Sequence, residues 1–167
     1  MPGLPANIYE ENRQALFTLA LSITGCKSSA EDCVQQAFAQ LYLKKLRLTR
    51  DPVAYVYRCV RNAAVDARRK NATDKRIRES VFNGFVPPRQ NSLDNPDDSV
   101  LTAERDQVIR QAIDQLPDSA RQIVLLKTFS DLTFKQIGKV LEIPEKTAAS
   151  QYRRALVKLK EKLKGER

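Results

Sequence analysis

The sequence predicts an all-α protein in which two small helical domains are joined by a flexible linker. Apolar residues recur at helical spacing near both ends of the 167-residue chain. Residues 71–100 interrupt this pattern with Asn, Asp and Pro, the residue types of turns and linkers. Charge follows the same division, because residues 1–70 carry 11 basic and 6 acidic side chains, 71–100 carry 4 and 5, and 101–167 carry 14 and 9. We therefore expect domains at 1–70 and 101–167.

The first domain is predicted to begin with two helices that lie close together in the sequence. Gly25 is placed to end the first helix, whose apolar face is formed by Leu16, Leu19, Ala20 and Ile23. Ser28 and Glu31 have the spacing of a capping box, which predicts that Ser28 is the N-cap of the second helix. The apolar face of this second helix is formed by Val34, Ala37, Phe38 and Leu41.

A third helix is predicted after a basic loop at residues 44–50. Asp51 and Pro52 are the residue types favoured at an N-cap and at the first helical position. The apolar face of this helix is formed by Val53, Val56, Tyr57, Val60 and Ala64. Its last turn is strongly basic, with Arg68, Arg69 and Lys70.

The second domain is predicted to contain a helix-turn-helix. Two helices come first, separated at Pro117. Thr133 and Gln136 then form a capping box that starts a short helix, and a turn leads into Pro144 and a longer helix. We expect the inward face of the longer helix to be Ala148, Tyr152, Ala155, Leu156, Leu159 and Leu163. A short helix, a tight turn and a longer helix is the arrangement that places the second helix in a DNA major groove.

The opposite face of this longer helix carries side chains that suit base edges and phosphates. At 100° per residue this face contains Lys146, Thr147, Ser150, Arg153 and Arg154 together with Val157, and Gln151 lies on its flank. A basic helix alone would be typical of an ordinary solvated surface. The short helix and turn before it favour DNA binding.

Composition narrows the class of function further. The formal net charge of +9 is expected of a protein that meets phosphates or anionic surfaces. No apolar run is long enough to span a membrane and the N-terminus lacks a signal-peptide pattern, so we expect a cytoplasmic protein without membrane insertion. The spacing of Cys26, Cys33 and Cys59 and the lack of histidine argue against a metal site, and we expect buried thiols and no cofactor. No nucleophile has an obvious base, so we expect no enzymatic activity.

The order of motifs resembles the extracytoplasmic-function sigma factors of bacterial RNA polymerase. The pattern D-x-x-Q-x-x-F of that family is matched by Asp32, Gln35 and Phe38. A later helix pattern is matched by Tyr55, Arg58, Asn62, Asp66 and Arg69. The region with the helix-turn-helix is matched by Leu116, Pro117, Arg121, Leu126, Phe129, Thr147, Ser150, Arg154, Ala155 and Leu156. The resemblance covers both predicted domains and leaves out mainly the linker.

The resemblance implies a set of partners and sites. The face with Asp32, Gln35 and Gln36 would dock on the clamp helices of the largest polymerase subunit, and the second domain would meet the flap of the second largest. Recognition and melting of the minus-ten element would fall to Lys44, Lys45, Arg47, Arg58, Arg61, Asn62, Arg68 and Arg69. Recognition of the minus-thirty-five element would fall to Lys146, Thr147, Ser150, Gln151, Arg153 and Arg154. Family membership also suggests an anti-sigma factor as a possible partner.

Some residues depart from the family pattern, and two other functions stay open. Ala148, Ala149 and Gln151 stand where many relatives carry other residues, including cations, and Gly138 replaces a more usual Ala, which lowers helix propensity. The first alternative is a helix-turn-helix regulator that binds duplex DNA as a dimer without polymerase. The second is a helical adaptor that binds protein and reads no DNA.

Overall fold

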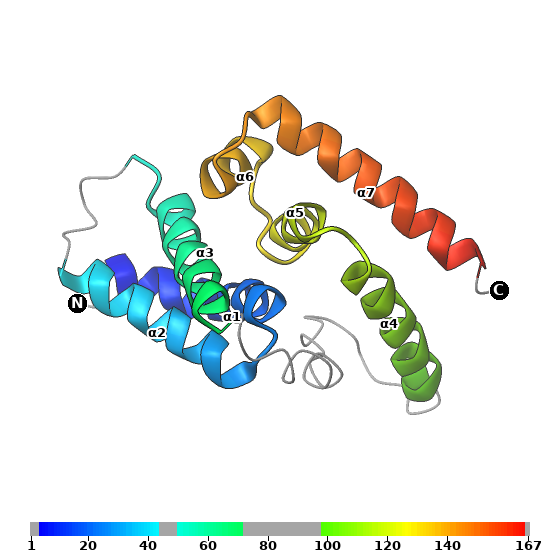
Figure 1. The fold of residues 1–167 in the computed structure, drawn as a ribbon, viewed down its shortest axis with the longest axis horizontal. Helices are drawn as coiled ribbons and strands as arrows, with labels where there is room; N and C mark the ends of the chain where they lie inside the picture. The colour runs from blue at the N-terminus through cyan, green and yellow to red at the C-terminus, as the bar shows by residue number, and fades with distance from the viewer. Residues whose placement is uncertain (1–3, 44–49, 72–97, 166–167) are drawn as a thin grey trace.

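The structure is a computed structural model that describes residues 4–43, 50–71 and 98–165. In these ranges every regular element is a helix (Figure 1), which confirms the predicted all-α class. The helices are α1 (Leu4–Thr24), α2 (Lys27–Leu43), α3 (Pro52–Lys70), α4 (Asp98–Asp114), α5 (Asp118–Phe129), α6 (Phe134–Leu141) and α7 (Glu145–Gly165). We call α1–α3 the N-terminal module and α4–α7 the C-terminal module. Most of the expected linker and the basic loop 44–49 lie outside the described residues.

The N-terminal module is a bundle in which each of its three helices packs against the other two. Gly25 ends α1 as predicted, because its φ of 71° lies in the left-handed region that glycine adopts without a steric cost. The prediction that Ser28 caps α2 is wrong, since this helix already begins at Lys27. The thiol of Cys26 takes the capping place and accepts a hydrogen bond from the backbone N–H of Ser29.

The start of α3 is the one that the sequence predicts. Pro52 opens the helix, and the carboxylate of Asp51 accepts a hydrogen bond from the backbone N–H of Ala54 at 3.2 Å. The buried face contains Tyr57, Val56, Val60 and Ala64, all with no exposed surface. A cap bond of this kind typically stabilises a helix by about 1 kcal/mol. Burial of each large apolar side chain typically contributes more than that.

In the C-terminal module, side chains satisfy backbone groups at two of the helix ends. The guanidinium of Arg121 donates to the carbonyls of Leu116 at 3.1 Å and Ile113 at 3.4 Å, which satisfies acceptors where α4 ends. The predicted capping box of α6 is present. The side-chain hydroxyl of Thr133 accepts a hydrogen bond from the backbone N–H of Gln136, and the side-chain oxygen of Gln136 accepts one from the backbone N–H of Thr133.

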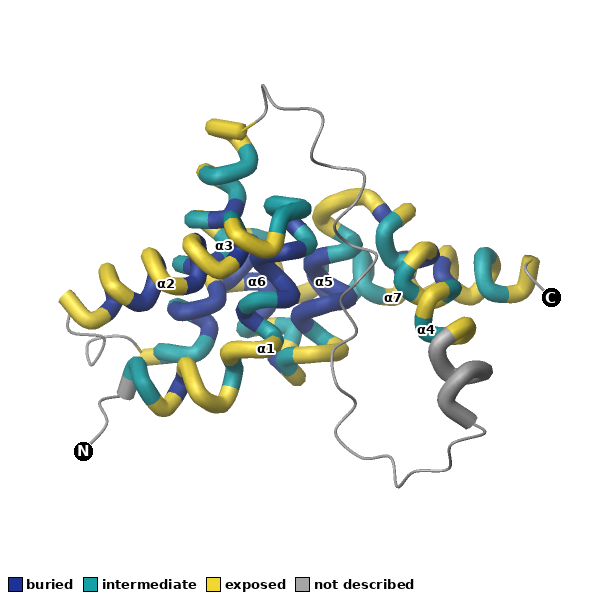
Figure 2. The backbone as a smooth tube through the Cα atoms, turned by 90° about the horizontal axis from the view of Figure 1, so that it is seen from below, coloured by how far each residue is buried: buried dark blue, intermediate teal, exposed yellow. Residues whose placement is uncertain are grey.

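The two modules pack against each other, which the expectation of a flexible linker did not anticipate. In Figure 1, α5 and α6 lie beside the N-terminal module, and contacts join α3 to α6 and α1 to α5. One continuous apolar core includes Tyr57 and Val60 of α3, Leu126 of α5, and Ile137 and Leu141 of α6. Figure 2 shows that the buried residues concentrate where these helices meet. We call this contact of α3 and α1 with α5 and α6 the module junction.

Candidate nucleic-acid interface

The outward face of α7 is open to solvent. Lys146, Arg153 and Arg154 are exposed, while Thr147 and Ser150 are half-buried. The hydroxyl of Ser150 donates to the carbonyl of Thr147 at 3.1 Å. Within the described ranges, no acidic side chain pairs with Arg153 or Arg154. These cations are therefore available to an anionic partner, as a DNA-reading helix requires.

Two residues of α7 lie differently from their expected positions. Leu156 was expected on the inward face, but 43% of it is exposed. The buried stripe of α7 is narrow and consists of Ala148, Ala155 and Leu159, so Leu156 falls on its flank, where no helix covers it fully. Gln151 is half-buried, and its side-chain oxygen is buried without a hydrogen-bond partner in the part of the chain that the structure describes.

The turn between α6 and α7 is closed tightly over a glycine. The backbone N–H of Ile143 donates to the carbonyl of Gly138 at 3.0 Å. A Cβ atom on Gly138 would lie 2.7 Å from the carbonyl oxygen of Ile143, closer than side chains normally approach. The rings of Phe134 and Tyr152, 5.5 Å apart, hold the two helices together beside this turn. Glycine at position 138 therefore lowers the helix propensity of α6 but allows the turn to pack closely against the helix.

The cationic ridge of α3, which we define as Arg58, Arg61 and Arg68, faces the C-terminal module. Arg58 forms an ion pair with Glu142, which follows α6. Arg61 donates from Nε to the side-chain oxygen of Gln122 in α5 at 3.3 Å. All three of these side chains were expected to meet the promoter.

The last member of the ridge reaches the start of α5. Arg68 pairs with Asp118 in the first turn of that helix at 2.7 Å. Asn62 and Arg69 lie beside the ridge and are exposed, and Asn62 accepts a hydrogen bond from Arg61 at 3.4 Å. The other residues expected at the minus-ten element, Lys44, Lys45 and Arg47, lie outside the described residues.

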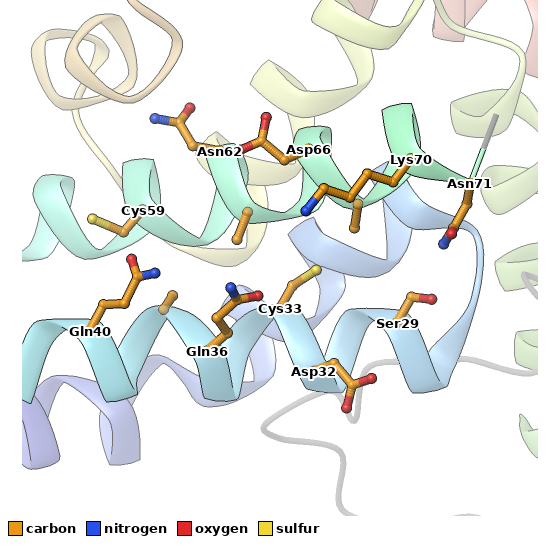
Figure 3. Close-up of a pocket in the computed structure, with 13 residues that line it drawn as sticks. Ser29, Asp32, Cys33, Gln36, Gln40, Cys59, Asn62, Asp66, Lys70 and Asn71 are labelled. Carbon is orange, nitrogen blue, oxygen red and sulfur yellow. The ribbon is translucent and has the colours of Figure 1, made fainter.

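The expected polymerase-docking residues lie on the exposed face of α2. Asp32, Gln35 and Gln36 are all exposed. Asp32 and Gln36 border a groove of about 440 Å³ between α2 and α3, and Gln35 borders a smaller groove of about 220 Å³ between α1 and α2. Figure 3 shows Gln36 pointing from α2 toward α3 and Asp32 pointing away from it. The face is polar with shallow grooves on both sides, which suits a reversible protein interface.

Four residues of the module junction were missed by sequence reasoning: Asp51 as an interdomain contact, Asp118, Gln122 and Glu142. Asp51 was expected only as a helix cap, yet its carboxylate also accepts from Gln136 and Lys139 of α6, both at 3.4 Å. Burial alone would raise the pKa of Asp51, but these bonds and that from Ala54 outweigh burial and lower it. The partners are 50 to 88 residues apart in sequence, so no local pattern signals these contacts.

Tyr57 lies at the centre of the junction and is completely buried. Its hydroxyl donates to the side-chain oxygen of Asn12 in α1 at 3.0 Å. Burial raises the pKa of Tyr57 to about 12, and a hydrogen bond with Ser130 at the end of α5 offsets this in part. One phenol therefore contacts both modules.

The remaining features are the three cysteines and the potential metal ligands within the described ranges. No cluster of three potential metal ligands occurs there. Cys26, Cys33 and Cys59 form no disulfide bond among the described residues; Cys33 is buried, and Cys26 and Cys59 are partly buried. The pKa of Cys26 is lowered, chiefly by the backbone N–H of Ser29, and that of Cys33 is raised by burial. Among the described helices, none combines the length and the apolar character needed to cross a bilayer.

Comparison with known proteins agrees with this arrangement. The family model for sigma-70 region 2 matches residues 8–73, and that for sigma-70 region 4 matches residues 106–159. The chain is 28% identical over 165 residues to the ECF RNA polymerase sigma factor SigW of Bacillus subtilis, covering 95% of this chain and 88% of the relative. It is 26% identical over 154 residues to SigM of the same organism, covering 92% and 91%.

A solved structure shares the fold. It is the sigma factor RpoE in complex with the anti-sigma factor NepR from Bartonella quintana, with a TM-score of 0.65 and 20% identity, covering 96% of this chain and 99% of that chain. The family matches fall on the two modules in the order that the motifs predict, and together they span most of the chain. The chain therefore belongs to the sigma-70 family and is a sigma factor of the extracytoplasmic-function (ECF) group.

Proposed function

We propose that this sigma factor divides promoter recognition between its two modules while core RNA polymerase holds both. In this proposal residues 1–70 dock on the polymerase and read the minus-ten element, residues 101–167 read the minus-thirty-five element, and residues 71–100 link them. The observation that carries the proposal is the combination, on one chain, of an exposed polar α2 face with a capped helix-turn-helix whose outward cations are exposed and pair with no acid among the described residues.

Docking falls to Asp32, Gln35 and Gln36, on the clamp helices of the largest subunit. Their exposure and the grooves on either side of α2 support this role. The C-terminal module would contact the flap of the second largest subunit. Bond-making then belongs to the polymerase, and we propose no catalysis by this chain.

The α3 surface would hold the melted minus-ten strand. Arg58, Arg61, Asn62, Arg68 and Arg69 lie along one side of this helix, and the basic loop with Lys44, Lys45 and Arg47 precedes it. Unstacking a base costs a few kcal/mol, and a basic surface that binds the single strand offsets that cost.

The α7 face would read the upstream duplex. The residues proposed for this role are Lys146, Thr147, Ser150, Arg153 and Arg154 on the outward side of the helix, together with Gln151 on its flank. Arginine and amide side chains suit bidentate contacts with purine edges, and the hydroxyls suit either base edges or phosphates. Gln151 has the buried oxygen described above, so it would need to change rotamer to reach a base.

Regulation and location complete the proposal. The similar RpoE was crystallised with an anti-sigma factor, which supports the proposal that such a partner also binds this chain in the cytoplasm. An independent helix-turn-helix regulator is not favoured, because the N-terminal module matches sigma-70 region 2.

The test is to mix the purified chain with core polymerase and a promoter library and to map transcription start sites. A sigma factor captures core in a pull-down and creates new specific starts. A regulator instead alters existing transcripts, and an adaptor binds protein without sequence preference. Absence of both core capture and new start sites would refute the proposal.

A further inference from the structure

The contacts of the C-terminal module follow α3 over nearly its whole length. Asp51, before the first turn, accepts from Lys139 and Gln136. Arg58, in the second turn of α3, pairs with Glu142, and Arg68, in the last turn of α3, pairs with Asp118. From Arg58 to Arg68 the helix rises roughly 15 Å, a distance that covers about four phosphates along one strand of duplex DNA. Two carboxylates and one amide thus occupy the cationic ridge at intervals along its length.

Glu142 has a backbone conformation that glutamate rarely adopts. Its φ of 59° and ψ of 42° are left-handed, and this C-terminal position after a helix normally favours glycine. The carboxylate that makes the residue different from glycine lies against Arg58. The contact across the module junction therefore supplies a physical reason for an acidic residue at this place.

The other nucleic-acid surface stays open in the same conformation. Lys146, Arg153 and Arg154 on α7 are exposed, and nothing in the described ranges pairs with them. Closure therefore covers the cationic ridge of α3 selectively. A merely compact arrangement of two basic modules would have no reason to place acids against one surface and leave the other free.

We propose that the C-terminal module competes with the promoter strand for the cationic ridge of α3, so that this closed form is an off state of the minus-ten surface. Asp118 and Glu142 take the place of phosphates, and the apolar core around Tyr57 holds them there. Opening of the module junction then precedes capture of the single strand, while α7 can meet duplex DNA in either form. This inference rests on the proposed role of α3.

The competition can be weakened without removing any proposed DNA-binding residue. The variant Asp118→Asn/Glu142→Gln neutralises both acids and keeps the apolar core. Its matched control is Glu104→Gln/Asp131→Asn, which makes the same two changes in the same module at exposed acids that pair with no cation in the described ranges. Asp131 also has a left-handed backbone, with φ of 50°, so the control matches Glu142 in conformation.

The first measurement is binding of the free full-length chain to a short fluorescent single-stranded DNA of random sequence, by anisotropy. We expect the Asp118→Asn/Glu142→Gln variant to bind about 3- to 10-fold more tightly than the unchanged chain, since each exposed ion pair contributes little but both act together. The control variant should bind within about twofold of the unchanged chain. An equal gain in both variants, or in neither, overturns the proposal.

The second measurement is the radius of gyration of the free chain by small-angle X-ray scattering. Arg58→Glu should enlarge the particle, because it places like charges together at the junction, and Arg58→Glu/Glu142→Arg should restore the compact size. No expansion, or expansion without rescue by the swapped pair, overturns the proposed contact. Neither measurement uses polymerase, so a failure of start-site mapping would refute the sigma function separately from the closed state.

Discussion

Gly138 is the residue on which the geometry of the helix-turn-helix depends most directly. Gly138→Ala would gain about 0.5–1 kcal/mol of helix propensity, but its Cβ would lie 2.7 Å from the Ile143 carbonyl. Forced displacement in a packed site typically costs about 1–3 kcal/mol, so we expect net destabilisation by about 1 kcal/mol. Urea denaturation measures this. Gly165→Ala is the control, because open space surrounds that glycine; an equal effect of both substitutions would contradict the steric explanation.

Tyr57 should make stability depend on pH at the alkaline end. Its pKa in the folded chain is about 12, whereas an unfolded tyrosine has a pKa near 10. Because the folded pKa is the higher one, the stabilisation is fully present below pH 10 and is lost as pH rises from about 10 to 12. The loss should be on the order of 2 kcal/mol.

Tyr57→Phe tests this assignment by thermal unfolding across that pH range. The variant should lose about 1 kcal/mol at neutral pH, because the hydrogen bonds of the phenol disappear, and its stability should fall less between pH 10 and 12. Tyr42→Phe is the control, since 60% of Tyr42 is exposed. Parallel pH profiles for the Tyr57 variant and the unchanged chain would exclude Tyr57 as the titrating group.

At the scale of single helices, local chemistry predicted most starts and ends correctly. Asp51 and Thr133 have side-chain oxygens that satisfy backbone N–H groups, and both caps are present. Ser28 failed because α2 extends back to Lys27, where Cys26 accepts the bond expected of the serine. Leu156 failed because helical spacing predicts an apolar stripe but not which flank a neighbouring helix covers.

The outward face of α7 leads to a prediction about upstream recognition. Arg154→Ala removes an exposed cation that the described part of the chain leaves unpaired, and it should weaken use of the upstream element by about 5- to 100-fold. Binding to core polymerase should be unchanged. Abortive transcription on promoters with and without the upstream element measures the effect. Lys164→Ala, near the end of α7, is the charge-matched control; equal losses in both variants would indicate a general charge effect.

At the scale of the whole molecule, substitutions on the proposed docking face of the N-terminal module should reduce binding to core polymerase, whereas substitutions on α7 should not. Asp32→Ala/Gln35→Ala should reduce affinity for core polymerase about tenfold or more, because both side chains are exposed on the proposed docking face. The control is Glu104→Ala/Gln107→Ala on α4, which removes an exposed acid and amide at the same spacing. Fluorescence titration with labelled core gives both affinities, and an unchanged value for the α2 variant would refute this docking face.

The sequence predicted the two modules but not their contact. Helical periodicity and caps are local, so they locate α1–α3 and α4–α7. The junction joins residues that are far apart along the chain, such as Arg58 with Glu142 and Arg61 with Gln122, and it turns a ridge expected to meet DNA toward protein. Basic and acidic side chains on separate helices show no pairing until the fold brings them together.

Glu142 finally has a consequence for comparing and engineering such proteins. The turn favours glycine at this position, while the contact with Arg58 requires an acid, so glutamate meets the second demand and glycine only the first. A consensus substitution of Glu142 by glycine, chosen for thermostability, would stabilise the turn of the helix-turn-helix and at the same time remove its ion pair with Arg58 of α3. Across homologues, the residue at this one site would therefore report whether a protein restrains its own strand-binding surface or leaves that restraint to a separate inhibitor.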